Sequence, residues 1–446
     1  MAALMDGDAY MERQQFEAPD SCMAYGELTL ADSAGRVVEQ RKPTGRKGAT
    51  IQIPLIRPNP PRLSVLTEAL AEIERSGIFS NFGPINSKFE AQILELMFKA
   101  TGACVTVANA TLGLMLAIKQ AVGCRPRRRY ALMPSFTFAA AAQAAIWCGL
   151  KPLFCDIDRE TWLPDAGAEE ALLRRYGGDI AVLLPNATFG NCLDLARYDR
   201  LSIAHGIPLV VDAAASLGSL NMQGEAFGRG SAHPLVFSMH ATKSFATSEG
   251  GLIYCADPSK IAVLRNMAGF GFSEARIATM PGLNAKLSEV AALLALTKLP
   301  DIEAISEHRF KLHQLYCSLL PGFTFQRMTG QRSALQFISV LLPEEHAGQV
   351  PRIAAELARH GIGTGCYFTP HLANHPFFQE NCVAGGLQVT EELSRRMISL
   401  PVSDFLTTDD VRYVCKTLRQ VCQPSRPRRG SAGLAAANTH HAGSLS

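Results

Sequence analysis

Lys243 is the residue of this sequence with the clearest potential for covalent chemistry. An apolar run, Leu235–Phe237, gives way abruptly to small and polar residues that surround this lysine. The run predicts a buried strand, so Lys243 would lie just beyond the end of that strand. A lysine fixed in such a partly desolvated place has a lowered pKa and is neutral enough to attack a carbonyl. The alternative is an ordinary solvated lysine in a polar loop.

Asp212 follows a second apolar run, Leu209–Val211, and is succeeded by three alanines and a serine. A carboxylate behind a buried strand is costly to desolvate unless it has a cationic partner. A protonated pyridine nitrogen would be such a partner, and the pairing would keep the ring an electron sink. Pyridoxal phosphate (PLP) combines that ring with the carbonyl that Lys243 needs. The alternative is an aspartate that caps the next helix.

A phosphate site is indicated after the run Cys104–Val107. The small residues Ala110 and Thr111 open a helix there, and free backbone amides at a helix N-terminus favour a phosphate. Ser238, five residues before Lys243, could donate its hydroxyl to the same phosphate. The alternative is that Asn109 and its neighbours only cap the helix.

An aromatic residue follows the run Tyr130–Met133. The segment Pro134–Phe138 would place an aromatic ring where it could stack on a flat cofactor. The alternative is that its phenylalanines belong to the core.

The elements that must position these residues alternate along the chain. Helix-length segments separate most of seven short apolar runs, which are Cys104–Val107, Tyr130–Met133, Leu153–Cys155, Ala181–Leu184, Leu209–Val211, Leu235–Phe237 and Leu252–Tyr254. The alternation predicts an α/β fold with a mostly parallel, doubly wound sheet covered on both faces. In such a sheet, ligands bind outside the carboxyl ends of the strands, which is where the candidate residues fall.

Four regions are predicted along the chain. We expect a flexible N-terminal extension at residues 1–50, a large cofactor-binding domain at 51–300, a small α+β domain at 301–422 and a flexible tail at 423–446. Two helical patterns, Leu63–Ser76 and Ser87–Lys99, are separated by a turn at Gly77–Pro84. Residues 51–83 could pack with the small domain.

Composition narrows the classes of function. The chain has 446 residues, a net charge of +3 and 47% hydrophobic residues, which suits a globular protein that binds small molecules rather than nucleic acid. Its 12 cysteines are scattered without a Cys-x-x-Cys pair, which favours reduced thiols in the cytoplasm and no zinc site. We also expect no membrane segment and no signal peptide.

Taken together, the motifs resemble those of the DegT/DnrJ/EryC1/StrS sugar aminotransferases from about Ile53 to Leu418. The resemblance is carried by their order along the chain: Asn109–Thr111, Pro134–Phe138, Asp212–Ala214, Ser238–Lys243, Glu249–Gly251 and Gly282–Glu289. It implies a fold-type I, aspartate-aminotransferase-like PLP fold with a large and a small domain. It also implies a homodimer with active sites at the subunit boundary.

The resemblance assigns the two catalytic residues. Lys243 matches the lysine that bonds to PLP and then moves the proton, and Asp212 matches the partner of the pyridine nitrogen. The dehydratase branch of the family has histidine at the lysine position, so Lys243 favours transamination.

The resemblance also assigns cofactor-binding residues. They are Phe138 as the stacking ring, Ala110, Thr111 and Ser238 as the phosphate cradle, and Asn284 as a residue that reaches the phosphate of the neighbouring subunit.

One departure from the family pattern concerns Ala215. Many members have a glutamine there that bonds near the PLP hydroxyl. The sequence therefore does not show which residue, if any, would take over this bond to the cofactor. We expect His240 to be structural, and the arginines 125 and 127–129 to form a solvated loop, with contact to a nucleotide diphosphate as the alternative.

The expected function is transfer of an amino group from L-glutamate to a nucleotide-linked keto-sugar. Two alternatives use the same cofactor: a fold-type I enzyme that aminates a cyclitol ketone or another small ketone, and a PLP-binding sensor without turnover. A nicotinamide enzyme is disfavoured because no Gly-x-Gly-x-x-Gly follows a strand with an acidic residue at the right distance.

Overall fold

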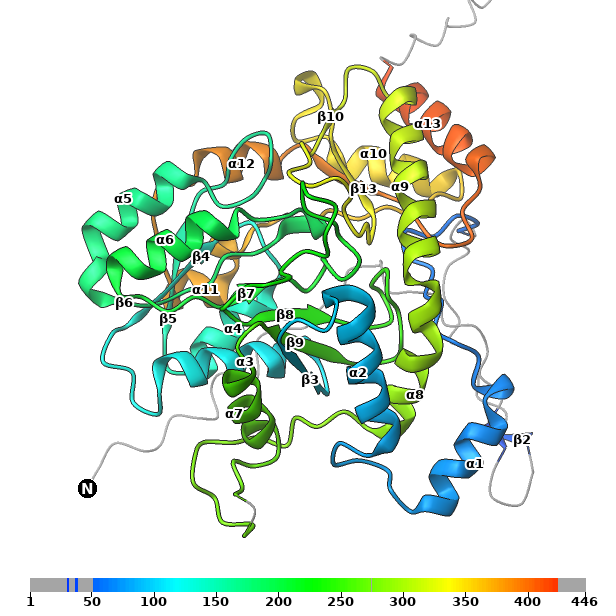
Figure 1. Cartoon of the computed structure of the whole chain (residues 1–446). Helices are drawn as coiled ribbons and strands as arrows, with labels where there is room; N and C mark the ends of the chain where they lie inside the picture. Colours follow the sequence, from blue (N-terminus) through cyan, green and yellow to red (C-terminus); the bar gives the residue numbers. More distant parts are fainter. Residues whose placement is uncertain (1–29, 32–36, 39–50, 274, 424–446) are drawn as a thin grey trace, which may run out of the picture. The chain divides into compact units, whose positions relative to one another are not determined.

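The computed structural model describes residues 30–31, 37–38, 51–273 and 275–423 (Figure 1). The chain divides into two compact units, residues 1–48 and 49–446. In the first unit, β1 (Leu30–Ala31) pairs antiparallel with β2 (Val37–Val38). The predicted flexible extension and tail, residues 1–50 and 423–446, otherwise lie almost entirely outside the described residues.

A large sheet forms the centre of the second unit and contains all seven predicted strands. They are β3 (Ala103–Val107), β4 (Tyr130–Pro134), β5 (Lys151–Cys155), β6 (Ile180–Leu183), β7 (Val211–Asp212), β8 (Leu235–Ser238) and β9 (Gly251–Cys255). Parallel bridges, Leu183 to Leu209 and Asn186 to Asp212, join the two four-stranded ladders into the order β12-β5-β4-β6-β7-β8-β9-β3. Every strand of this sheet except β9 runs in the same direction, so the predicted mostly parallel sheet is confirmed.

Both faces of this sheet are buried, as its continuous apolar runs predict. Successive side chains of β8 alternate between two cores: Leu235 and Phe237 enter one, and Val236 enters the other. The first core includes α2 (Pro84–Phe98), α5 (Ala166–Tyr176), α6 (Leu195–His205) and α8 (Glu289–Lys298). The second includes α3 (Ala110–Val122), α4 (Ala139–Trp147) and α7 (Pro258–Ala268), on the other side of the sheet in Figure 1.

A second, antiparallel sheet is built by the C-terminal part of the chain. It consists of β10 (Thr324–Phe325), β11 (Ile338–Leu341) and β13 (Met397–Leu400). The helices α9 (Ile302–Leu319), α10 (Val350–Arg359) and α13 (Thr408–Cys422) share its core. These elements have the α+β character expected of residues 301–422, while the domain boundary near residue 300 stays a prediction.

One segment of this C-terminal part joins the large sheet instead. The strand β12 (Val383–Ala384), which the sequence did not reveal, pairs parallel with the edge strand β5. It is flanked by α11 (Pro376–Asn381) and α12 (Gln388–Ser394). The sheet therefore has one more strand than the alternation predicted.

The first helical segment differs from the expected single helix over 63–76. A short 3-10 turn, Leu63–Val65, precedes α1 (Thr67–Ser76), because Leu66 leaves the helical region with φ −106° and ψ 16°. Across residues 51–273 and 275–423, no helix combines the length and the apolar character that crossing a membrane requires.

Candidate active site

The predicted site residues gather at one edge of the large sheet. The parallel strands β3, β7 and β8 end there, at Val107, Asp212 and Ser238. The antiparallel β9 begins at the same edge, where Gly251 pairs with both Val107 and Ser238. Segments far apart in the sequence thus meet at the place where a doubly wound sheet binds its ligand.

Lys243 lies in the loop between β8 and β9, which backbone hydrogen bonds hold in place. Thr247 N donates to Met239 O at 3.0 Å, and Lys243 N donates to His240 O at 2.9 Å. Desolvation lowers the pKa of the Lys243 ammonium to about 8, although the negative charge of Asp212 acts in the opposite direction. A substantial fraction of this amine is therefore neutral at a pH just above 7, and the neutral form is the one that a nucleophile requires.

Asp212 ends β7, and only 3% of the residue is exposed. Its Oδ1 accepts a hydrogen bond from Ala214 N at 3.1 Å, and its Oδ2 accepts one from Asn186 Nδ2 at 3.0 Å. Burial raises the pKa of Asp212, while these two bonds and the charge of Lys243 partly offset that rise. Turns rather than a helix follow Asp212, so the helix-cap alternative is wrong.

The N-terminus of α3 has the features of an anion site. Asn109 caps the helix by accepting from Leu112 N at 2.9 Å. The amides of Ala110 and Thr111 have no hydrogen-bond partner among the described residues. A Cβ on Gly251 would lie 2.9 Å from Ala110 N, so this glycine lets the helix end approach the strand edge.

Ser238 lies beside this helix end because it pairs with Gly251 across the β8–β9 ladder. Its Oγ accepts from His240 N at 3.3 Å, which leaves the hydroxyl hydrogen to donate to a ligand.

The side chains of Phe138 and Asn284 are both exposed to solvent. Phe138 lies in the short connection from β4 to α4, directly before α4, and is 63% exposed, which is unusual for a ring of this size. The Asn284 Oδ1 accepts from Lys286 Nζ at 2.5 Å. The backbone beside it, at Ala285 O, accepts from Ala108 N at 2.7 Å, which places Asn284 next to the N-terminus of α3.

Gln336 is a site residue that the sequence analysis missed. It precedes β11, and its Oε1 accepts a hydrogen bond from Lys243 Nζ at 3.0 Å. Ala215, the departure from the family pattern, has no polar side chain, whereas Gln336 brings an amide to Lys243 from a distant part of the chain. A single glutamine in an apolar run gives no local signal of such a contact.

His240 is tied into the loop as a scaffold histidine. Its Nδ1 accepts from Thr242 N at 3.3 Å and lies 2.8 Å from Thr242 Oγ1, while its Nε2 lies 3.5 Å from Glu249 Oε1. These contacts agree with the structural role predicted for it.

The loop of arginines precedes β4 and therefore lies at the amino end of that strand, at the edge opposite Asp212. Arg128 donates to Ile180 O at 3.1 Å, and Arg129 pairs with Asp179 at 3.0 Å. This placement disfavours the diphosphate alternative and fits the solvated loop.

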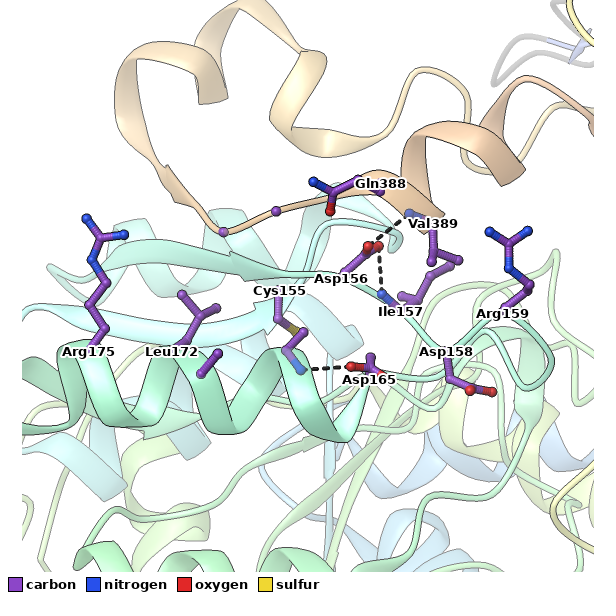
Figure 2. A pocket seen from close by; sticks show the side chains of 14 residues that line it. Cys155, Asp156, Ile157, Asp158, Arg159, Asp165, Leu172, Arg175, Gln388 and Val389 are labelled. Carbon is purple, nitrogen blue, oxygen red and sulfur yellow. Dashed lines mark hydrogen bonds between the residues drawn. The ribbon is translucent and has the colours of Figure 1, made fainter.

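A cavity of about 570 Å³ lies at the carboxyl end of β5, between α5 and the chain around α12 (Figure 2). Asp156 lines it but directs its carboxylate into bonds with Ile157 N and Val389 N, both at 2.9 Å. Arg159, at its rim, is paired with Glu392. None of the residues predicted for the active site lines this cavity.

Comparisons with known proteins bear on this site. The model of the DegT/DnrJ/EryC1/StrS aminotransferase family matches residues 64–419. Protein Rv3402c of Mycobacterium tuberculosis is 33% identical over 381 residues, which cover 84% of this chain and 91% of that protein. A dTDP-4-amino-4,6-dideoxy-D-glucose transaminase of Shigella dysenteriae is 26% identical, with coverage of 82% and 98%.

Solved structures show the same similarity. The crystal structure of a protein described as a PLP-dependent aminotransferase, from Bacillus cereus ATCC 10987, is 35% identical in sequence to this chain. Its TM-score is 0.78, and the match covers 82% of this chain and all of that chain. The structure of DesI with its TDP-sugar product is 29% identical, with a TM-score of 0.74 and coverage of 84% and 94%. The predicted fold-type I architecture and the predicted cofactor are thereby confirmed. This chain belongs to the DegT/DnrJ/EryC1/StrS aminotransferase family, whose members depend on pyridoxal phosphate.

Proposed function

We propose that this aminotransferase moves an amino group from L-glutamate to a keto-sugar carried on a nucleotide, and so makes an amino sugar. The observation that carries the proposal is the Lys243 amine, which burial holds at a pKa of about 8 at the strand edge that also bears Asp212. The relatives that act on nucleotide-linked sugars, DesI and the Shigella transaminase, support the choice of substrate class.

The residues of the site fit PLP by their chemistry. Asp212 has acceptor capacity left for a cation, and the unpartnered amides of Ala110 and Thr111, with the Ser238 hydroxyl, suit a phosphate. The exposed ring of Phe138 suits stacking on a flat ring. When bound, PLP supplies a carbonyl for a lysine and a ring that accepts electron density.

Lys243 has two tasks in the proposed reaction. It anchors the cofactor, and as a released amine it carries the proton between the carbon that loses hydrogen and the carbon that gains it. A pKa of about 8 suits both tasks, because a proton carrier works best when its pKa lies near the working pH. Ala214 and Asn186 fix the Asp212 carboxylate so that it does not rotate away from its cation.

We also propose that the protein is a homodimer and that Asn284 serves the partner's site. The support is the exposure of Asn284 and Phe138 at the edge that carries the site. A second copy would cover these side chains and complete the phosphate cradle.

An absorbance spectrum tests the cofactor and the first half-reaction together. The wild-type protein should show a visible PLP band that bleaches with L-glutamate, whereas Lys243→Ala should show neither that band nor turnover. Mass spectrometry of the second product then tests the acceptor, with a TDP-linked keto-sugar compared against a keto-inositol. Substantial activity of Lys243→Ala would disprove the role of the lysine, and amination of the keto-inositol alone would favour the cyclitol alternative.

A mixing experiment tests the shared site. Lys243→Ala and Asn284→Ala protomers, each inactive alone, should regain activity when they are mixed and allowed to exchange subunits. In the hybrid dimer, one site receives the native lysine from one protomer and the native asparagine from the other. If Asn284 served its own subunit, every site in the hybrid would carry one defect and no activity would return.

A further inference from the structure

Gln336 bridges two residues of the loop between β8 and β9, residues 239–250, which carries Lys243 and is called the lysine loop below. Its Oε1 accepts from Lys243 Nζ at 3.0 Å, and its Nε2 donates to Thr242 Oγ1 at 3.2 Å. The orientation of the amide is fixed by this pair, because an ammonium can only donate and must therefore face the amide oxygen. Thr242 in turn contacts His240, so the loop holds the amide at both ends.

The segment that carries Gln336 is itself anchored on both sides. Before it, Arg332 forms a two-bond ion pair with Glu303, at 2.6 and 2.7 Å, and Ala334 N donates to Ser219 Oγ at 2.9 Å. After it, the ring of Phe337 stacks on Tyr367 with 4.7 Å between centroids. The backbone of Gln336 therefore has little freedom, and its amide marks a fixed point in space.

We propose that Gln336 is a positioning residue that holds the Lys243 amine in place whenever this lysine is not bonded to the cofactor. The inference rests on the proposed role of Lys243 as cofactor anchor and proton carrier. A released lysine has four rotatable bonds and would otherwise sample many directions. One hydrogen bond to a fixed acceptor restricts that search and keeps the amine directed at the reacting carbon.

The proposal also makes the segment 332–337 a functional partner of the lysine loop. Gln336 lies 93 positions from Lys243 in the sequence and two residues before the start of β11 of the second sheet. A change that displaces this segment would thus alter the lysine without touching any residue of the loop that carries it.

The contact can be tested without catalysis. In the full-length chain freed of cofactor, each lysine is pulse-labelled with acetic anhydride between pH 6 and pH 10, and the labelled peptides are quantified by mass spectrometry. Asp212 is the charged group that acts on the Lys243 amine, and it is present in every variant tested. Lys286, another lysine whose pKa is lowered by desolvation, is the internal reference.

The expected result depends on the substitution. Since the amide oxygen stabilises the ammonium more than the neutral amine, Gln336→Met should move the labelling midpoint of Lys243 below about 8, and Gln336→Glu should move it above. Loss of one hydrogen bond should also lower kcat about three- to tenfold, with the KM for L-glutamate within about twofold. The matched control is Gln331→Met, because Gln331 directly precedes the segment 332–337 but bonds to Met222 O at 3.0 Å.

Two outcomes would overturn the proposal. One is a Gln336→Met profile that coincides with those of wild type and Gln331→Met, with kcat unchanged. The other is a fall in kcat in which Lys286 labelling and thermal unfolding change as much as Lys243 labelling does, since that pattern indicates general loosening. If Lys243→Ala kept its PLP band, the proposed function would fail instead, while the labelling would still report the contact.

Discussion

Two buried aspartates lie at the carboxyl ends of parallel strands of one sheet, and they differ in how fully they are bonded. Asp156, after β5, accepts four hydrogen bonds: from Ile157 N, Val389 N, Thr390 N and Thr390 Oγ1, at 2.8–2.9 Å. Asp212, the last residue of β7, accepts two such bonds at its carboxylate. A carboxylate has room for about four, so Asp156 is saturated and Asp212 is not.

We propose that this difference in bonding separates a structural carboxylate, Asp156, from a functional one, Asp212. Three of the four donors to Asp156 belong to α12 and join that helix to the end of β5, and Figure 2 shows the bonds from Val389 and from the adjacent Ile157. Asp212 is more deeply buried, at 3% against 7% exposed, yet it retains capacity for another partner. Burial with unused acceptor capacity is costly unless a cation is bound, which is the situation that PLP would create.

The largest expected effect is that of Asp212→Asn on catalysis. Removing one member of a buried charge pair costs about 3–5 kcal/mol, so kcat should fall about 10²- to 10⁴-fold. The free energy of unfolding of the cofactor-free chain should change by less than about 1 kcal/mol, because Asn keeps the shape and loses a desolvated charge. Steady-state kinetics and urea unfolding measure the two quantities, and a variant that keeps kcat but loses stability would reverse the assignment.

The reverse pattern is expected for Asp156→Ala. Four donors would lose their acceptor, and the free energy of unfolding should fall by about 2–3 kcal/mol. The folded fraction should still bind PLP and keep a kcat close to that of the wild type. Urea unfolding and active-site titration by absorbance give both values, and a kcat that fell as far as in Asp212→Asn would place Asp156 in the chemistry.

A smaller effect is expected in the pH dependence of reconstitution with PLP. In its proposed role Lys243 attacks PLP as the neutral amine, and its pKa is lowered from 10.5 to about 8. The second-order rate should therefore rise with pH, about fivefold from pH 7 to 8 and less than about twofold from 8 to 9. Without Lys243 burial the rise would continue to pH 10.

The two aspartates should differ in this experiment as well. Asp212 raises the pKa of Lys243, so Asp212→Asn should move the midpoint to lower pH. Asp156→Asn should leave it in place. Stopped-flow absorbance across pH 6–10 records both, and equal midpoints in all three proteins would show that Asp212 exerts no field at the amine.

The sequence predicts most of the fold because each strand of the large sheet, except β12, overlaps a short, mainly apolar run. It predicts Lys243 and Asp212 for the same reason, since each follows such a run within a few residues. The pattern of apolar runs alone does not separate Asp212 from Asp156, which follows β5 in the same way, and it was the resemblance to the family that assigned Asp212. In the structure they are distinguished by the number of donors, and three of the four donors to Asp156 come from residues more than 230 positions away.

Two features of the structure, the strand β12 and the contact of Gln336, give no signal in the local sequence pattern. The strand β12 has two residues and is followed by two glycines, so no periodicity could reveal it. Gln336 stands alone in an apolar segment, and its role depends on a contact between distant parts of the chain. The residues that the sequence missed are those positioned by tertiary packing rather than by their own strand.

The smallest expected effect comes from removing a single donor at the saturated carboxylate. Thr390→Val deletes the hydroxyl that donates to Asp156 Oδ1 at 2.8 Å and keeps the shape of the side chain. Three donors would remain, so the free energy of unfolding should fall by about 1 kcal/mol with kcat unchanged.

The matched change at the other carboxylate is Asn186→Leu, which removes one of the two donors of Asp212. It should lower kcat several-fold, because a carboxylate held by one bond can rotate away from its cation. If both variants lost only stability, the number of donors would not distinguish a structural aspartate from a functional one.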